Sequence, residues 1–168
     1  LWRLLLDGRD ESSRWADLAD SWEPLAAWPY YAFNDMFAVM SMVGAGRLDP
    51  AQQFVDSRRA WARDAPKAVT NVAMTQNIGI PVCQAIVDFG RGHDDAVLDG
   101  LLPIRNRIGE FGGSHAQRAA VQRTLLVSAL RARRLDLARA LLSERISVKP
   151  ASPWNWRRQA QFVARTSP

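Results

Sequence analysis

Four basic or polar side chains lie on either side of a glycine-rich turn in the second half of the sequence. Arg105 and Arg107 precede the turn at residues 109–113, and His115 and Arg118 follow it. A helix is expected to begin directly after the glycines, and a helix N-terminus adds unpaired backbone N–H groups and positive potential. This arrangement predicts a pocket for a carboxylate, sulfate or phosphate group.

Asn34 and Asp35 are the candidate residues of this pocket from an earlier part of the chain. Spacing alone does not place them there. The alternative is that Arg105 or Arg118 pairs with Asp35 or Glu110 and so fastens neighbouring helices together. The sequence leaves both interpretations open.

A metal site or a nucleophilic site has few candidate residues. The chain has two histidines, His93 and His115, and one cysteine, Cys83, which are too few for a closed zinc site of nitrogen and sulfur ligands. Ser114 and His115 would project about 100° apart on a helix, so they do not form a nucleophile and base pair. Ser114 with Gln117 instead predicts a capping box. We expect no metal and no cofactor.

Three segments of similar sequence are predicted to lead from a turn into a helix. Each has small or basic turn residues, an aspartate interpreted as the helix N-cap, and an alanine where the second helix of a hairpin approaches the first. The segments are 46–51, 91–96 and 133–138, and their alanines are Ala51, Ala96 and Ala138.

Repeated helix hairpins of this kind predict an all-α, tetratricopeptide-like α-solenoid in a single domain. Alternating β-branched runs are scarce, whereas Ala, Leu and Arg are abundant. Trp156 is expected where a following repeat would bury its first large side chain. The predicted hairpins cover residues 30–64, 68–108 and 114–149, and a terminal capping helix covers 152–165.

The first residues have the pattern of the end of an apolar helix that has no N-cap. We therefore expect a piece of a longer protein, in which Leu1, Trp2, Leu4 and Leu5 expose an apolar patch through which molecules associate. Further tryptophans as far as Trp28 predict a capping core beside this end.

The charge of the chain is divided unevenly. Residues 102–168 hold 13 Lys and Arg against 3 Asp and Glu, whereas residues 1–101 hold 9 against 14. This asymmetry is compatible with an acidic partner, which could be a nucleic acid, an anionic membrane surface or an acidic peptide. The alternative, which the charge pattern favours, is that the arginines only solvate exposed faces and satisfy helix C-termini. A nucleic-acid partner is disfavoured because no recognised binding module is present.

The single cysteine excludes an internal disulfide, and it indicates either a reducing compartment or a protein that is indifferent to redox state. Apolar neighbours such as Ile80 and Val82 predict a buried Cys83 thiol. No apolar run reaches the roughly 20 residues needed to cross a bilayer. A cytoplasmic location is expected.

Several segments resemble the tetratricopeptide repeat protein 38 family, and the resemblance extends over nearly the whole chain. It implies the C-terminal portion of a helical-repeat protein. It implies no chemistry, because the family lacks an established reaction. Met36 and Phe37 stand where family members tend to have a His shortly after the Asn-Asp pair, and Ala119 stands where they tend to have an Asp. The similar segments are 1–4, 33–35, 101–105, 112–118, 140–145 and 149–153.

Two functions follow from these patterns. The leading one is a scaffold that binds a peptide or partner protein through a concave groove, with no catalysis expected. The alternative is an enzyme or small-anion-binding protein that uses a pocket formed by His115, Arg118 and Arg105.

Overall fold

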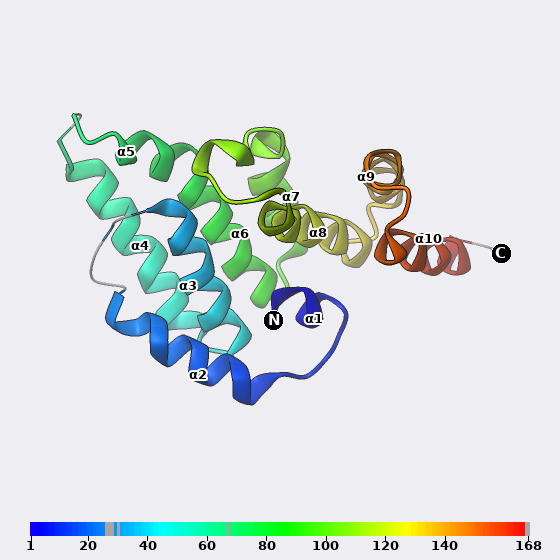
Figure 1. Ribbon diagram of the computed structural model, residues 1–168, viewed down its shortest axis with the longest axis horizontal. Coiled ribbons are helices and arrows are strands. Elements are labelled where there is room, and N and C mark those ends of the chain that lie inside the picture. The colour runs from blue at the N-terminus through cyan, green and yellow to red at the C-terminus, as the bar shows by residue number, and fades with distance from the viewer. Residues whose placement is uncertain (26–28, 30, 67, 167–168) are drawn as a thin grey trace.

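The computed structural model describes residues 1–25, 29, 31–66 and 68–166. In these residues all regular structure is helical, so the all-α fold class is confirmed (Figure 1). Three short 3₁₀ segments, Glu23–Leu25, Leu102–Ile104 and Ile108–Phe111, connect longer helices. The α-helices are α1 (Trp2–Leu6), α2 (Ser12–Trp22), α3 (Ala32–Gly44), α4 (Leu48–Asp64), α5 (Asn71–Met74), α6 (Ile80–Gly90), α7 (Asp94–Leu101), α8 (His115–Arg131), α9 (Leu135–Val148) and α10 (Pro153–Thr166).

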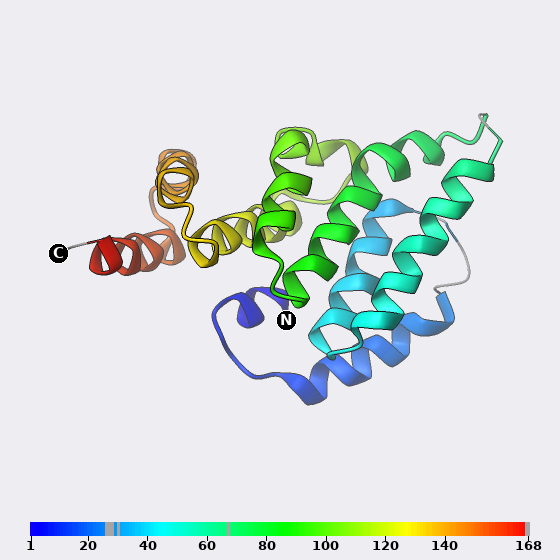
Figure 2. The ribbon, with the colours of Figure 1, turned by 180° about the vertical axis from the view of Figure 1, so that it is seen from behind.

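Helices α2 to α7 form a block, from which α8 leads to α9 and α10 at the far end (Figure 1). Helix α6 packs against α3, α4 and α7, and α7 packs against α8. Figure 2 shows α4 and α6 side by side on the opposite face. Helix α9 is seen nearly end-on, whereas α8 and α10 run across the view, so α9 crosses both of them steeply (Figure 1). The expected stack of antiparallel hairpins stays a prediction.

The predicted segments contain successive helix pairs. Helices α3 and α4 lie within 30–64, α6 and α7 within 68–108, and α8 and α9 within 114–149. Tyr30, the predicted start of the first hairpin, and Trp28, part of the predicted capping core, lie outside the described residues.

The turns inside these three pairs have the same backbone conformation. Each contains one residue with positive φ, and the backbone N–H of the next residue donates to a carbonyl five residues earlier, as in a Schellman motif. The donor to acceptor distances are 2.8 Å from Arg47 to Met42, 2.9 Å from His93 to Asp88 and 2.9 Å from Arg134 to Ala129. The positive-φ residues are Gly46 at 74°, Gly92 at 75° and Arg133 at 57°.

This conformation corrects the predicted register of the second turn and the predicted N-caps. The helices begin at Leu48, Asp94 and Leu135, so the aspartates lie inside the first turn, and no side chain caps these helices. Gly92 has the same place in its turn as Gly46, so the aspartate equivalent to Asp49 is Asp95. The segments 46–51 and 91–96, as compared in the sequence, had paired Asp49 with Asp94 instead. The residues equivalent to Ala51 are therefore Val97 and Ala138.

Burial agrees with the corrected register. Ala51, Val97 and Ala138 are each 0% exposed, whereas Ala96 is exposed. Ala96 is not a packing residue because it lies one position before the buried site, about 100° around the helix. The prediction for Ala96 is wrong, and Val97 takes its place.

The prediction for Trp156 is also wrong, because this side chain is 50% exposed and Trp154 is buried at 4%. The two residues are about 200° apart on α10, so only one of them can face α9 and α8. The Trp156 Nε1–H donates to the Pro150 carbonyl oxygen at 2.6 Å.

Gly79 and Pro81 interrupt a long helix without ending it. Helix α5 leads through the π-helical turn Thr75–Gly79 directly into α6. A π-turn rearranges the hydrogen bonds that a proline would otherwise break. A Cβ on Gly79 would lie 2.7 Å from the Cβ of Ala32, so this glycine allows α3 to pack closely.

The N-terminal helix does not form the predicted exposed patch. Trp2 is 5% exposed, and its Nε1–H donates to the Thr124 hydroxyl on α8 at 2.8 Å. Its ring also contacts Trp15 and Phe89. Trp2 is buried because α1 packs against α8, which is far away in the sequence. The other residues of the predicted patch, Leu1, Leu4 and Leu5, are half-buried.

Candidate functional site

The first turn of α8 is fixed by the capping box predicted from Ser114 and Gln117. The Ser114 hydroxyl accepts from the Gln117 backbone N–H at 3.3 Å, and the Ser114 N–H donates to Gln117 Oε1 at 2.8 Å. The prediction is confirmed. Because the helix start is held this way, His115 and Arg118 project from a defined position.

The loop before α8 packs tightly against α3. Gly112 and Gly113 have φ values of 89° and 77°, in the left-handed region that favours glycine. Phe33 fills the space beside Gly113. Arg118 Nη1 donates to the Gly112 carbonyl oxygen at 3.3 Å and also to the Gly113 carbonyl oxygen. The loop therefore holds the Arg118 side chain in place.

Replacing Gly113 with Ala should lower the free energy of unfolding by roughly 1–3 kcal/mol. The new Cβ would overlap the Phe33 ring, and the backbone would be strained at this φ. Gly109→Ala is the matched control, because nothing lies within 4 Å of its added Cβ and no positive φ is required. Urea unfolding followed by circular dichroism compares the two. A Gly113→Ala midpoint equal to that of Gly109→Ala would contradict the tight loop.

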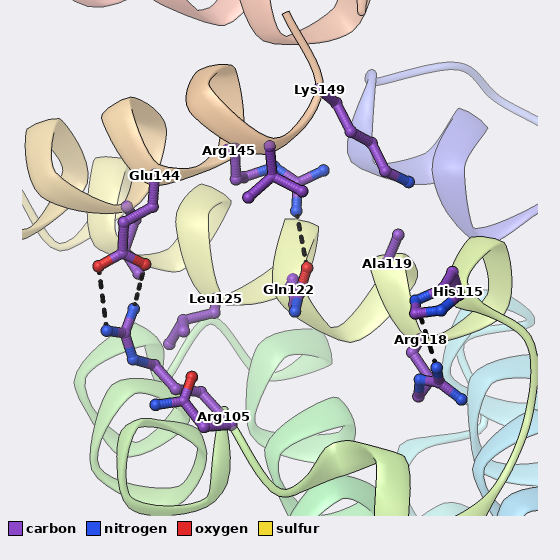
Figure 3. A pocket seen from close by; sticks show the side chains of 12 residues that line it. Arg105, His115, Arg118, Ala119, Gln122, Leu125, Glu144, Arg145 and Lys149 are labelled. Carbon is purple, nitrogen blue, oxygen red and sulfur yellow. Dashed lines mark hydrogen bonds and ion pairs between the residues drawn. The ribbon is translucent and has the colours of Figure 1, made fainter.

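A pocket of about 300 Å³ lies between α8, α9 and the turn after Leu102–Ile104 (Figure 3). We call it the basic pocket. It brings together three of the predicted site residues, Arg105, His115 and Arg118. The full lining is Arg105, Asn106, His115, Arg118, Ala119, Gln122, Leu125, Leu141, Glu144, Arg145, Val148 and Lys149.

Three other predicted residues, Arg107, Asn34 and Asp35, do not line the basic pocket. Arg107 pairs with Glu110 at 2.7 Å on the surface. Asn34 is an exposed residue of α3. Asp35 is buried because its position on α3 faces α4, where its Oδ1 accepts from Arg58 Nε at 3.1 Å.

Arg105 and Arg118 do not have the ion-pair partners that were predicted to hold neighbouring helices together. Arg105 makes two hydrogen bonds with Glu144 of α9, at 2.8 and 3.0 Å. Arg118 contacts the glycine loop and, through Nη2, His115 Nδ1 at 3.3 Å. Neither Arg105 nor Arg118 pairs with Asp35 or Glu110, so the predicted clamp is wrong. Glu144, the carboxylate of the basic pocket, is engaged by Arg105 (Figure 3).

Arg145 and Lys149 belong to the basic pocket and were not predicted. Leu141, Glu144, Arg145 and Val148 follow the spacing of one helix face, and that spacing is the signal that could have identified them. Asn155, which is fully buried, donates through Nδ2 to the carbonyl oxygens of Arg145 at 3.0 Å and Lys149 at 3.3 Å. Helix α10 thus fixes the end of α9.

Arg145 lies in an environment that disfavours its charge. Its Nη1 donates to Gln122 Oε1 at 3.2 Å, whereas its Nε is buried without a hydrogen-bond partner among the described residues. Burial lowers the pKa of Arg145 to about 10, with further lowering from the nearby Arg123 and Arg3. An anion beside this guanidinium would remove the imbalance.

His115 does not have the surroundings of a general base. Its side chain is exposed and contacts the Arg118 guanidinium. A catalytic histidine is commonly oriented by a carboxylate, and His115 has no such contact in the described part of the chain. Residues 1–25, 29, 31–66 and 68–166 also contain no group of three or more His, Cys, Asp or Glu residues that could hold a metal ion. The arrangement suits anion binding.

No family model matches the sequence, and no solved structure matches the chain significantly. The resemblance to the tetratricopeptide repeat protein 38 family therefore stays a prediction. None of the described helices is long and apolar enough to span a membrane.

Proposed function

We propose that this chain is a helical-repeat scaffold that binds an acidic segment of a partner protein in the basic pocket. One observation carries the proposal. Arg118, Arg145 and Lys149 face one pocket whose carboxylate, Glu144, is already bound by Arg105. The pocket thus keeps a positive charge that the protein itself does not neutralise, which matches a ligand rich in carboxylates.

The lining can both attract and orient such a segment. Arginine donors form charge-assisted hydrogen bonds with carboxylates, which are stronger than neutral ones. The amides of Gln122 and Asn106 add neutral donors and acceptors, and an apolar floor accepts the methylene groups of acidic side chains. The floor consists of Ala119, Leu125, Leu141 and Val148.

The fold supports a binding role of this kind. Helices α8 and α9, one of the three helix pairs with the same turn, supply two walls of the basic pocket, and helical repeats commonly present extended binding surfaces. The resemblance to the tetratricopeptide repeat protein 38 family supports the same proposal. Catalysis gains no support from the position of His115.

Arg145→Met should weaken the binding of an acetylated and amidated tetraglutamate peptide by about tenfold, because one buried charge-assisted hydrogen bond contributes this much. Arg139→Met is the matched control. Arg139 is on the same helix and carries the same charge, but it is exposed and does not line the basic pocket. Fluorescence anisotropy of the labelled peptide at low salt measures both affinities.

The same variants separate binding from stability. A cation whose pKa is lowered in the folded state binds its proton less tightly there, so its charge costs stability at pH values below about 10. Arg145→Met should therefore leave the unfolding midpoint at pH 7 unchanged or raise it. Equal peptide affinity in the two variants, or no binding by the unmodified protein, would overturn the proposed function.

A further inference from the structure

A second group of arginines lies behind the wall of the basic pocket. The guanidinium carbons of Arg123, Arg145 and Arg158 lie 4.5, 5.3 and 5.2 Å from the ring centre of Trp154. Three cations therefore share one indole from helices α8, α9 and α10. Arg145 belongs both to this group and to the basic pocket, so the two positive regions are continuous.

Two further arginines extend this region to the surface. Arg3 and Arg157 are exposed and lie close enough to disfavour the charge of Arg123. Together with Arg123, Arg145 and Arg158 they form what we call the Trp154 arginine group.

The Trp154 arginine group has more positive charge than its neighbours neutralise. Asp7 accepts from Arg158 at 3.0 Å and from the Trp154 Nε1–H at 2.8 Å. Arg123 Nε, in contrast, is buried without a hydrogen-bond partner among the described residues. Burial and nearby arginines lower the pKa of Arg123, and Asp7 offsets this in part. The charge that remains is available to a ligand.

We propose that the ligand is a run of consecutive acidic residues long enough to extend from the basic pocket past Arg145 to Arg123 and Arg157. This inference rests on the proposed function and specifies its ligand as a multivalent acidic segment. Four residues in extended conformation span roughly 13 Å and twelve span roughly 40 Å, so the longer run can contact the basic pocket and the whole Trp154 arginine group at once, whereas the shorter one contacts fewer of these arginines.

The covered ring of Trp154 favours an acidic peptide over a single-stranded nucleic acid at the centre of this group. Proteins that bind single strands stack bases on exposed aromatic rings. Trp154 is 4% exposed and its ring is covered by guanidinium groups, so a base cannot stack on it. Carboxylates need charge and hydrogen-bond donors but no open ring. The Trp154 arginine group supplies charge and hydrogen-bond donors.

The test compares labelled tetraglutamate and dodecaglutamate, both acetylated and amidated, by fluorescence anisotropy. The unmodified protein should bind the longer peptide at least about tenfold more tightly, since several partly exposed charge contacts are added. Its affinity should also fall more steeply with salt concentration. Arg157→Gln combined with Arg123→Gln should remove most of this difference and leave tetraglutamate binding unchanged. Arg139→Gln controls for the loss of charge.

The outcomes separate the two proposals. Equal affinity for both peptides would overturn the proposal that the ligand extends to the Trp154 arginine group, and the basic pocket would remain the binding site. Binding of neither peptide would overturn the proposed function itself. Tighter binding of a twelve-residue thymidine oligonucleotide than of dodecaglutamate would assign the site to nucleic acid instead. Arg157→Gln alone keeps the test valid if the Arg123 variant fails to fold, because Arg157 is exposed on α10.

Discussion

Replacing Asp35 with Ala should lower the free energy of unfolding by about 3–5 kcal/mol, because it leaves a buried guanidinium without its carboxylate. Arg58 is 4% exposed, and its Nε donates to Asp35 Oδ1 at 3.1 Å. Among the described residues, it also contacts the Phe54 ring at 4.1 Å and makes a long hydrogen bond to the Ser57 hydroxyl at 3.4 Å. Neither one supplies a negative charge. Urea unfolding at pH 7 measures the loss.

The loss of stability in Asp35→Ala should come from the unpaired charge of Arg58 and not from the loss of attraction within the Asp35–Arg58 ion pair. Burial raises the pKa of Asp35, although Arg58 beside it acts in the opposite direction. Ionising Asp35 inside the fold is therefore less favourable than in water even with its partner in place. Asp35→Ala combined with Arg58→Met should accordingly recover most of the lost stability, because both charges leave the core together.

A surface pair provides the matched comparison. Asp56 and Arg59 are 2.6 Å apart and both are exposed, so Asp56→Ala should cost less than about 1 kcal/mol. If Asp35→Ala were as mild as Asp56→Ala, water would have to reach Arg58. A double variant as unstable as Asp35→Ala would mean that the cost arises from lost packing and not from charge.

The helical class and the turns could be predicted from local patterns because both depend on neighbouring residues. Gly46 and Gly92 mark the positive φ that the shared turn requires. Arg133 has the same conformation although it is not a glycine, so the third turn could be predicted only from the similarity of segment 133–138 to the other two. The register error at the second turn arose because Asp94 and Asp95 are adjacent and the segments were matched on an aspartate, whereas matching Gly92 to Gly46 selects Asp95.

The basic pocket could be predicted only where its residues are close in the chain. Arg105, His115 and Arg118 flank one glycine turn, and the structure places them in one pocket. Arg145 and Lys149 come from the next helix, whose rotation depends on the buried Asn155 of α10. The helical spacing shows that Arg145 shares a face with Leu141 and Val148, but which neighbour this face meets is determined by long-range packing.

Asp35 and Trp2 show the same limit. Asp35 was a candidate for the pocket or for an ion pair with Arg105 or Arg118, and Trp2 was expected in an exposed patch, but each is buried against a partner from another helix. Arg58 of α4 buries Asp35, and Thr124 of α8 receives the hydrogen bond from Trp2. A buried polar group needs a specific partner, and that partner is determined by the tertiary fold.

Replacing Ala138 with Leu should lower the free energy of unfolding by roughly 1–3 kcal/mol, because the added methyl and methylene groups have no space between α8 and α9. Ala138 is 0% exposed in the first turn of α9. Ala51 has the same position and burial in α4, so Ala51→Leu should have a cost of the same order. Thermal and urea unfolding both measure these losses.

Ala96→Leu is the control that the corrected register provides. Ala96 also lies in the first turn of its helix, so the change in helix propensity is about equal, but its side chain is exposed. Its unfolding midpoint should stay within about 0.5 kcal/mol of the unmodified protein. The original register predicts instead that Ala96→Leu and Ala138→Leu are equally damaging. A destabilised Ala96→Leu beside a neutral Val97→Ala would restore that register, because the buried position of the second pair would then be Ala96.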